Sequence, residues 1–305
     1  MHVFNSTIAL TRGQRVLNHT EYQVQIADEK AEAKLAADAS KAIHDAAAAT
    51  EDNATGLLCK LNLILGFIHL VTGAAILVMA HFVVRTHGFV PVYYSAWNRP
   101  TLQVPEWTLH LTQLAPDVQV FDFIGLFLLL SAADHISSVI FRARYELGLR
   151  ARCNHFRWFE YSLSLPVMSI VIGLLCGALD AWMLATLALL SVLAITVGWT
   201  HDAVVVSEDE RNYFLLALGW FPFAALWALT MMLVFDHAIF EHSVPNFVWA
   251  VLFTLFALES CFGFVSMLEM KYTSREVWYC MLSLVAKQLL AWITFSGVMS
   301  LPASS

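Results

Sequence analysis

The stretch EVWYCMLSLVAKQLLAWITFSGVMS, residues 276–300, places one cation, Lys287, near the middle of a predominantly apolar segment long enough to cross a bilayer. A lysine at the centre of a membrane helix costs about 2.5–3.5 kcal/mol on scales derived from translocon insertion. We therefore expect this amine either to pair with a buried carboxylate or to be used covalently. The usual covalent use is a Schiff base, because desolvation favours the neutral amine that attacks an aldehyde. Ser283 lies one helical turn earlier on the same face.

The composition of the whole chain is that of an integral membrane protein. Of its 305 residues, 59% are hydrophobic and only 13% are charged, which is far from the balance of soluble domains. We predict an all-α membrane protein whose seven apolar segments each approach the length of a membrane span. These segments are 57–84, 118–141, 156–179, 181–199, 213–235, 246–269 and 276–300.

Three regions follow from this pattern. Residues 1–56 form a polar tail, 57–300 form the seven-helix domain, and 301–305 form a short C-terminus. The connection between the first and second spans is the one long loop. Its apolar and aromatic residues lie at 90–94, 97 and 102–107, with Pro91, Pro100 and Pro105 as breakers. This pattern predicts a small β-hairpin.

Lysine and arginine counts predict the orientation in the membrane. Fourteen of these residues fall on the side of the N-terminal tail, whereas only Arg85 and Arg99 fall on the other side. The positive-inside rule then predicts a cytoplasmic N-terminus and an external C-terminus, most simply in the plasma membrane. No basic stripe suggests nucleic acid, and the five scattered cysteines support neither a disulfide framework nor a metal site.

Glu160 is the candidate partner for the buried amine. A cationic group at Lys287 requires a balancing carboxylate in the apolar interior. Counted along their helices, Lys287 lies about 15 Å from its helix start and Glu160 about 6 Å from its own. The depths match if the third span begins a turn or two earlier, near residues 149–153. The alternative for Glu160 is an interfacial pair with Arg157.

Other polar side chains fall inside predicted spans. Ser131 and His135 lie four residues apart on the second span and His69 lies within the first, so they can line one cavity and accept a proton. Hydrogen-bonded packing is the alternative for each histidine. Asp134 and Glu259 are further costly interior acids, which belong either to a proton path or to structural pairs.

Several aromatic residues fall where a flat polyene ligand would need walls. They are Trp158, Tyr161, Phe253, Phe256 and Trp292. Packing or anchoring at the membrane interface is the alternative explanation for these side chains.

Two motifs resemble the heliorhodopsins, which are retinal proteins of inverted orientation. These motifs are RWFEYSLS at 157–164 and SLVAK at 283–287, the second followed by Trp292. The resemblance implies all-trans retinal bound to Lys287 as a protonated Schiff base, with Glu160 as counterion and Ser283 as a hydrogen-bonding neighbour. It also implies that Ser131, His135 and His69 form a polar cluster near the chromophore, and that the protein is a homodimer with the hairpin at its interface.

The function expected on these grounds is light sensing with a slow photocycle, rather than pumping or enzymatic catalysis. Signalling would reach a cytosolic partner through the arginine-rich connection between the second and third spans and through the tail. The alternative is a light-gated proton channel that uses Glu160, Glu259 and Asp134. A third possibility is a retinal-free bundle in which Lys287 and Glu160 form an ion pair.

Overall fold

The computed structural model describes residues 19–84, 87–98, 108–204, 212–240 and 244–301. The chain divides into two compact units, Met1–Asn53 and Ala54–Ser305. In the first unit, the described residues form the beginning of α1 (His19–Val78), where alanine, lysine and glutamate favour helix. Arg85 and Arg99, on which the predicted orientation partly rests, lie outside the described residues.

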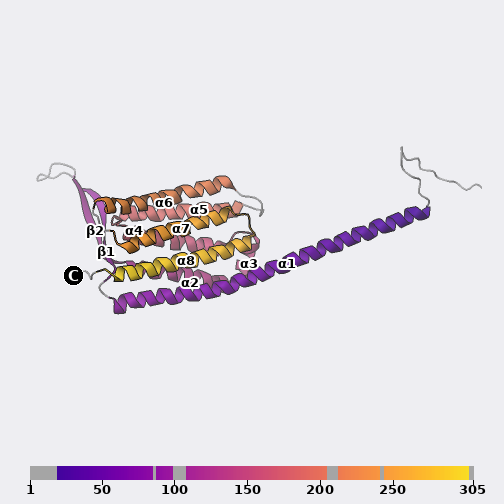
Figure 1. Ribbon diagram of the computed structural model, residues 1–305, viewed down its shortest axis with the longest axis horizontal. Coiled ribbons are helices and arrows are strands. Elements are labelled where there is room, and N and C mark those ends of the chain that lie inside the picture. Colours follow the sequence, from indigo (N-terminus) through magenta and orange to yellow (C-terminus); the bar gives the residue numbers. More distant parts are fainter. Residues whose placement is uncertain (1–18, 85–86, 99–107, 205–211, 241–243, 302–305) are drawn as a thin grey trace, which may run out of the picture. The chain divides into compact units, whose positions relative to one another are not determined.

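Seven helices of the described chain are long and apolar enough to cross a membrane, which confirms the predicted fold class. The first span covers Asn53–Val83 and ends in a π-helical turn, η1 (Met79–Val83). The other six are α2 (Val120–Ile140), α4 (His155–Leu175), α5 (Ala181–Val204), α6 (Tyr213–Phe240), α7 (Asn246–Met267) and α8 (Tyr272–Met299) (Figure 1). The ends differ from those predicted by a few residues.

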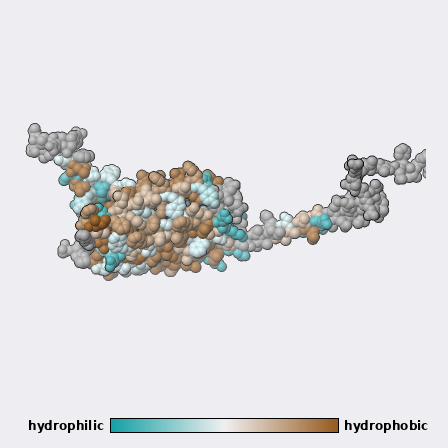
Figure 2. All heavy atoms as spheres, turned by 45° about the horizontal axis from the view of Figure 1, so that its top comes forward, coloured by the Kyte–Doolittle hydropathy of each residue, from teal (hydrophilic) through white to brown (hydrophobic). Residues whose placement is uncertain are grey.

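The outer flank of the bundle is apolar. Phe214, Phe221 and Phe240 on α6 are each about three-quarters exposed, at 75%, 76% and 74%. Figure 2 shows hydrophobic side chains over most of the visible flank of the bundle. In water such a surface would be unfavourable, whereas acyl chains solvate it, so these side chains are placed for contact with lipid.

The predicted hairpin is present, but its second strand lies further along the chain than expected. β1 (Phe89–Asn98) pairs antiparallel with β2 (Thr108–Gln119). The expected second strand, at 102–107, falls on residues outside the described ones. The register shifts between Val90 and Val92 and again between Val92 and Tyr93. Pro91 on β1 and Pro116 on β2 lie at the first shift, and proline cannot donate a ladder hydrogen bond. The Tyr93 amide donates to the Leu179 carbonyl at 2.9 Å, which joins β1 to the α4–α5 turn.

The α4–α5 connection is a tight turn, as the adjoining ends of the predicted spans at 179 and 181 require. Gly177 adopts a φ of 91°, which side chains with a Cβ rarely tolerate. Asp180 then caps α5, since its Oδ1 accepts from the amides of Trp182 and Met183 at 2.9 and 3.1 Å.

A short helix that the sequence did not predict follows α2. This helix, α3 (Arg142–Arg150), starts after a single non-helical residue, Phe141. Its buried side chains Tyr145 and Leu149 pack with Leu58 and Leu65 of α1. The connection between the second and third spans is therefore an ordered helix rather than a loop.

Candidate functional site

The buried ion pair between Lys287 and Glu160 is the centre of the site. Lys287 Nζ on α8 lies 2.7 Å from Glu160 Oε1 on α4, and the two residues are only 2% and 5% exposed. Ser131 on α2 donates to the same Oε1 at 2.6 Å. Three spans therefore meet at one carboxylate. Taking two charges out of water is favourable only when such contacts compensate the lost hydration.

From the sequence, the depths of Lys287 and Glu160 matched only if the third span began near residues 149–153. The span does not begin there, although the pair forms. α4 begins at His155, after its cap Asn154, rather than a turn or two earlier, and α8 begins at Tyr272. The sequence comparison assumed that both helices start at one level and run parallel, whereas membrane helices tilt relative to one another. The lysine side chain also points back toward the start of its helix, which shortens the gap.

Ser283, predicted as a neighbour of the amine, is 3% exposed and lies one turn before Lys287 on α8. Its Oγ has no hydrogen-bond partner among the described residues. The hydroxyl is therefore a donor held in the apolar interior beside the amine.

The two predicted histidines lie together. The rings of His69 and His135 stack with centroids 5.6 Å apart and an interplanar angle of 2°. His135 Nδ1 lies 2.6 Å from Asn62 Oδ1, and Gln288 Nε2 lies 3.3 Å from His69 Nδ1. Ser131 donates a hydrogen bond to the carboxylate that also pairs with Lys287. The predicted polar residues therefore lie around one region of the bundle.

The sequence interpretation missed four members of this polar cluster, Asn62, Tyr145, Gln288 and Thr72. Asn62 Nδ2 donates to the Tyr145 hydroxyl at 3.0 Å, so the cluster extends to α3. Gln288 also accepts from Thr72 Oγ1 at 3.1 Å. The position of Gln288, directly after the lysine on α8, was the available signal, whereas nothing local in the sequence distinguishes Asn62 or Tyr145.

A second buried charge cluster joins the beginning of α4 to α5 and α8. Arg157 Nη2 lies 2.9 Å from Asp202 Oδ2 and 2.9 Å from Glu276 Oε1. Asn154 Nδ2 donates to Glu276 Oε2 at 2.7 Å. Arg157 therefore pairs with these two acids, not with Glu160 as the alternative from the sequence had it. Asp202 was missed because the predicted fourth span ended at residue 199, whereas α5 continues to Val204 and carries Asp202 in its last turn.

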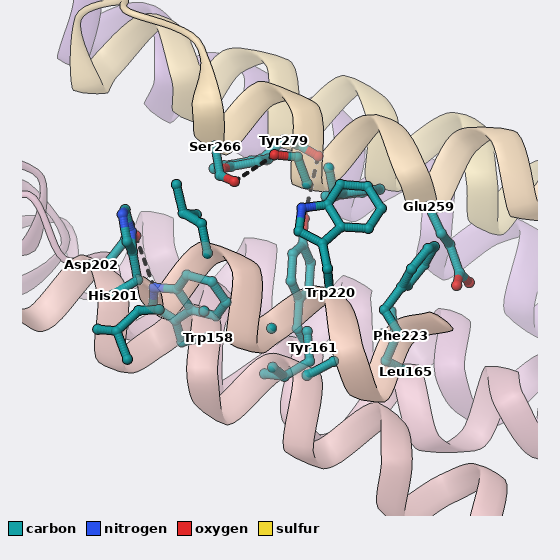
Figure 3. A pocket seen from close by; sticks show the side chains of 18 of the residues that line it. Trp158, Tyr161, Leu165, His201, Asp202, Trp220, Phe223, Glu259, Ser266 and Tyr279 are labelled. Atoms are coloured by element: carbon teal, nitrogen blue, oxygen red, sulfur yellow. Dashed lines mark hydrogen bonds and ion pairs between the residues drawn. The ribbon is translucent and has the colours of Figure 1, made fainter. Parts of the chain in front are cut away.

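A cavity of about 160 Å³ opens between α4, α5, α6, α7 and α8. Figure 3 shows His201 and Asp202 at one end, Glu259 at the other, and the ring of Tyr161 between them. The Lys287 amine lies 5.2 Å from the centre of the Tyr161 ring. Tyr161 lines the cavity, whereas Lys287 and Glu160 are not among the lining residues, so the ion pair adjoins the cavity through Tyr161.

Only part of the predicted aromatic wall lines this cavity. Trp158 and Tyr161 line it, and Trp158 Nε1 donates to Asp202 Oδ2 at 3.0 Å. Phe256 packs against the cavity residue Phe223 in a stacked pair. Phe253 and Trp292 are 50% and 44% exposed and are not among the lining residues.

The missed lining aromatics come mainly from α6 and α7. They are Trp220, Phe223, Phe262 and Tyr279. Two glycines could have indicated where a tryptophan ring approaches another helix. A Cβ at Gly263 would collide with the Trp220 ring, and a Cβ at Gly198 would lie 2.7 Å from the Trp158 ring. Helix interiors that carry glycine often allow another group to approach closely.

Of the two predicted interior acids, Glu259 belongs to the cavity. Its Oε2 accepts from Trp227 Nε1 at 3.2 Å. Asp134 is half-buried on α2 and is not among the residues that line the cavity.

Seven spans around a buried lysine–carboxylate pair define a protein of the rhodopsin fold, and solved structures agree. A cyanorhodopsin from Tolypothrix sp. NIES-4075 matches with a TM-score of 0.57 and 15% identity, covering 78% of this chain and 93% of that one. A cyanorhodopsin from Calothrix sp. NIES-2098 matches at 0.55 and 15%, covering 79% and 94%. Thermophilic rhodopsin from Rubrobacter xylanophilus matches at 0.55 and 14%, covering 80% and 96%. At these identities the likeness concerns the fold.

A family within this fold can also be assigned. The heliorhodopsin family model matches residues 58–299, and the chain belongs to the heliorhodopsin family. None of the curated proteins matches it. Family and fold together make it a retinal protein that responds to light and an integral, multi-pass membrane protein. The site fits retinal: a buried amine with a carboxylate partner stands beside a cavity with aromatic walls.

Proposed function

We propose that this protein is a light sensor in which Lys287 holds retinal as a protonated Schiff base and Glu160 is the counterion. The observation that carries the proposal is the 2.7 Å contact between these buried groups, next to Tyr161 of the cavity wall. A structural ion pair would need no adjoining cavity with aromatic walls. Bound retinal, all-trans in the dark, supplies absorption of visible light and a change of shape on isomerisation.

The surrounding residues have separate tasks in this proposal. Glu160 balances the positive charge at Lys287, and the Ser131 hydroxyl fixes the orientation of the carboxylate at 2.6 Å. Tyr161 and Trp158 bound the space next to the amine and exclude water from it. Ser283 offers an unused hydroxyl there.

The histidine pair is suited to holding a proton that leaves the amine. His135 is hydrogen-bonded to Asn62, and His69 Nε2 has no hydrogen-bond partner among the described side chains. Asn62 Oδ1 only accepts, so His135 Nδ1 carries the hydrogen and Nε2 of the neutral His135 ring is the nitrogen that can accept a proton. Nδ1 of His69 accepts from the Gln288 amide, so the unpartnered Nε2 of His69 is an N–H that can donate one. A proton kept in this cluster returns only slowly, which supports a slow photocycle and a sensor rather than a pump.

The signalling output is proposed to leave from the Arg157 cluster. Arg157 holds the ends of α5 and α8 through Asp202 and Glu276, so a shift of α4 would be felt at both. A cytosolic partner that binds the connection between α2 and α4, or the N-terminal tail, would detect this movement.

The test is spectroscopic. Purified protein with added all-trans retinal should show a visible absorption band, and Lys287→Ala should abolish it. Borohydride reduction should leave a retinyl adduct on Lys287. The control is Lys271→Ala, an exposed lysine that precedes α8. Wild-type protein that stays colourless with retinal would rule out the proposal.

A homodimer is part of the same proposal, with the plasma membrane as its location. On β2, Leu109, Leu111 and Leu114 are 58%, 62% and 60% exposed, which leaves an apolar strand surface available for a second copy. Leu109→Asp combined with Leu111→Asp should convert the purified dimer to a monomer in light scattering. A wild-type monomer would contradict this part.

Glu259 supports a second candidate function, a light-gated proton channel. This carboxyl lies at the far end of the cavity whose other end holds Asp202, and such interior acids are costly unless used. In this alternative Glu160 and Glu259 exchange protons along the cavity, and Asp134 is a further relay. The two functions differ in whether light drives a current.

A further inference from the structure

The parallel rings of His69 and His135 are each hydrogen-bonded to a side-chain amide. His69 is 0% and His135 is 7% exposed. Their ring centroids lie 5.6 Å apart, with an interplanar angle of 2°. Gln288 contacts Nδ1 of His69, whereas Asn62 contacts Nδ1 of His135. In a neutral histidine, the hydrogen bond at one ring nitrogen determines which nitrogen carries the hydrogen, so the two amides set the tautomers of this pair.

The orientation of the Gln288 amide is fixed by Trp292. The indole Nε1 of Trp292 can only donate, and it lies 3.2 Å from Gln288 Oε1. Thr72 Oγ1 donates to the same oxygen at 3.1 Å. The nitrogen end of the Gln288 amide therefore faces His69, with Nε2 at 3.3 Å from His69 Nδ1. His69 Nδ1 is the acceptor, so the neutral ring carries its hydrogen on Nε2.

The Asn62 amide has the opposite effect on His135. Asn62 Nδ2 donates to the Tyr145 hydroxyl at 3.0 Å, which leaves Oδ1 at 2.6 Å from His135 Nδ1. An amide oxygen only accepts, so His135 Nδ1 carries the hydrogen and its Nε2 keeps a lone pair. The two stacked rings are therefore opposite tautomers.

Opposite tautomers limit the pair to one added proton. Nε2 of His69 already carries a hydrogen, and the lone pair on its Nδ1 is occupied by Gln288. Only Nε2 of His135 has a lone pair to offer. A proton bound there converts His135 to an imidazolium, and a second positive charge on the neighbouring ring would be disfavoured.

The source of the proton lies close to His135. Ser131, one turn earlier on α2, donates to Glu160 Oε1 at 2.6 Å, and the same oxygen lies 2.7 Å from Lys287 Nζ. On its other side His135 contacts only the oxygen of a carboxamide, which is a very weak base. Asn62 therefore does not carry a proton onward to Tyr145.

We propose that Asn62 and Gln288 are positioning residues that fix opposite tautomers on the histidine pair and make it a store for a single proton with one opening. In the forward step an N–H bond at Lys287 breaks, an N–H bond forms at Nε2 of His135, and the positive charge moves with the proton. The reverse step uses the same nitrogen. The origin of the proton rests on the proposed function, whereas the tautomers require no retinal.

The tautomers can be measured on the full chain in lipid vesicles without retinal. In solid-state NMR of protein with ¹⁵N-labelled histidine, the shifts of the two ring nitrogens distinguish the Nδ1–H, Nε2–H and imidazolium forms. Correlations to neighbouring residues assign the signals, so this measurement requires no variant. His69 should be the Nε2–H form and His135 the Nδ1–H form, and a His135 that carries its hydrogen on Nε2 would overturn the proposal.

Substitution of each amide tests its role. Asn62→Leu removes the acceptor, so the hydrogen of His135 should move to Nε2, which is the tautomer that a free imidazole side chain prefers in water. Asn62→Asp retains an acceptor and should keep the hydrogen on Nδ1. Gln288→Met should shift the Nδ1 signal of His69 to that of a nitrogen without a hydrogen bond. Ser296→Ala, an exposed position two turns further on α8, is the matched control.

These variants separate positioning from packing. A side chain that only fills space would not distinguish Asn62→Leu from Asn62→Asp, which are similar in size. An unchanged His135 in Asn62→Leu would remove Asn62 from its role, and an unchanged His69 in Gln288→Met would remove Gln288. Circular dichroism checks that each variant is folded.

Flash photolysis of the protein with retinal tests the single opening. The visible band of wild type should disappear and recover while a pH-indicator dye detects no proton in the medium. Asn62→Asp should delay the recovery about tenfold, because a carboxylate holds the imidazolium by a charge-assisted hydrogen bond. A proton in the medium, or recovery of Asn62→Asp at the wild-type rate, would overturn the store. Protein that stays colourless would refute the proposed function alone, since the spectra without retinal still decide the tautomers.

Discussion

The guanidinium of Arg157 lies 2.9 Å from both Asp202 and Glu276, so that one buried cation on α4 holds the end of α5 and the beginning of α8. The ring of Trp158 adds a cation–π contact at 4.1 Å. All three charged residues are nearly inaccessible, with exposures of 5%, 5% and 0%. In such a cluster each charge depends on the others, because water is not available to replace a lost partner.

Arg157→Met should therefore be strongly destabilising. It leaves Glu276 buried without its cation and Asp202 with only the more distant Arg275, at 3.9 Å, and the loss of one partner of a buried ion pair typically costs about 3–5 kcal/mol. The thermal unfolding midpoint in detergent should fall markedly. Arg142→Gln, which breaks an exposed ion pair, should leave it unchanged. The double change that also carries Glu276→Gln should recover much of the loss, because Asp202 is kept as the partner of the buried Arg275. An Arg157→Met protein that melts like wild type would refute this role of Arg157.

Glu160→Gln should shift the visible band to longer wavelength. The carboxylate stabilises positive charge at the amine in the ground state, so its removal lowers the excitation energy. Ser131→Ala removes the hydrogen bond to the same oxygen and should give a smaller change in the opposite direction. Ser138→Ala, a buried serine two turns along α2, is the matched control for absorption spectra. An unchanged spectrum in Glu160→Gln would remove it from the counterion role.

Sequence patterns predict the spans and the central pair because each has a local signature. A run of about twenty apolar residues predicts a membrane helix wherever it occurs. A lysine inside such a helix, such as Lys287, requires a partner. Glu160 was then chosen as the partner by comparing its depth along its helix with that of Lys287. The helix ends and the short helix α3 were harder, since a nine-residue segment with four charges resembles a loop.

The rest of the site depends on which way each helix faces, and that information is weak in this chain. α6 is apolar all round, so nothing in its periodicity distinguishes Trp220 and Phe223, which line the cavity, from the exposed Phe221 between them. The sequence also did not indicate which way Phe253 and Trp292 face. Both were predicted as wall residues, whereas in the structure both are half-exposed. The hydrogen bond between Asn62 and Tyr145 joins residues that are 83 positions apart, and no local sequence pattern indicates it.

Tyr145→Phe should destabilise the protein by about 1–3 kcal/mol, because it leaves the buried Asn62 amide without its acceptor. Burial raises the pKa of Tyr145 well above its ordinary value of about 10. Above about pH 10 the unfolded chain releases the phenolic proton while the folded chain keeps it. The free energy of unfolding of the wild type therefore falls as the pH rises past about 10. The variant should lose less over this interval in denaturant titrations. Parallel curves for the two proteins would show that the phenol is not protected.

The orientation predicted from charge can be tested with single cysteines. Arg144→Cys on α3 and Gln113→Cys on β2 both replace exposed residues, whereas four of the five native cysteines are buried and Cys261 is half-buried. In intact cells, a membrane-impermeant maleimide should label Gln113→Cys and spare Arg144→Cys until the cells are opened. Unmodified protein gives the background. The reverse labelling pattern would place the N-terminus outside.

Voltage clamp under illumination separates the sensor from the channel. If the protein is a sensor, wild type should carry no sustained photocurrent, since the proton released at Lys287 stays in the histidine cluster and returns. If the cavity conducts, the current should reverse with the proton gradient and disappear in Glu259→Gln, because Glu259 closes the far end of the cavity. Ser260→Ala, the next residue on α7, serves as the matched control. A current that survives in Glu259→Gln would exclude the path through this cavity, because no proton could then be relayed at its α7 end.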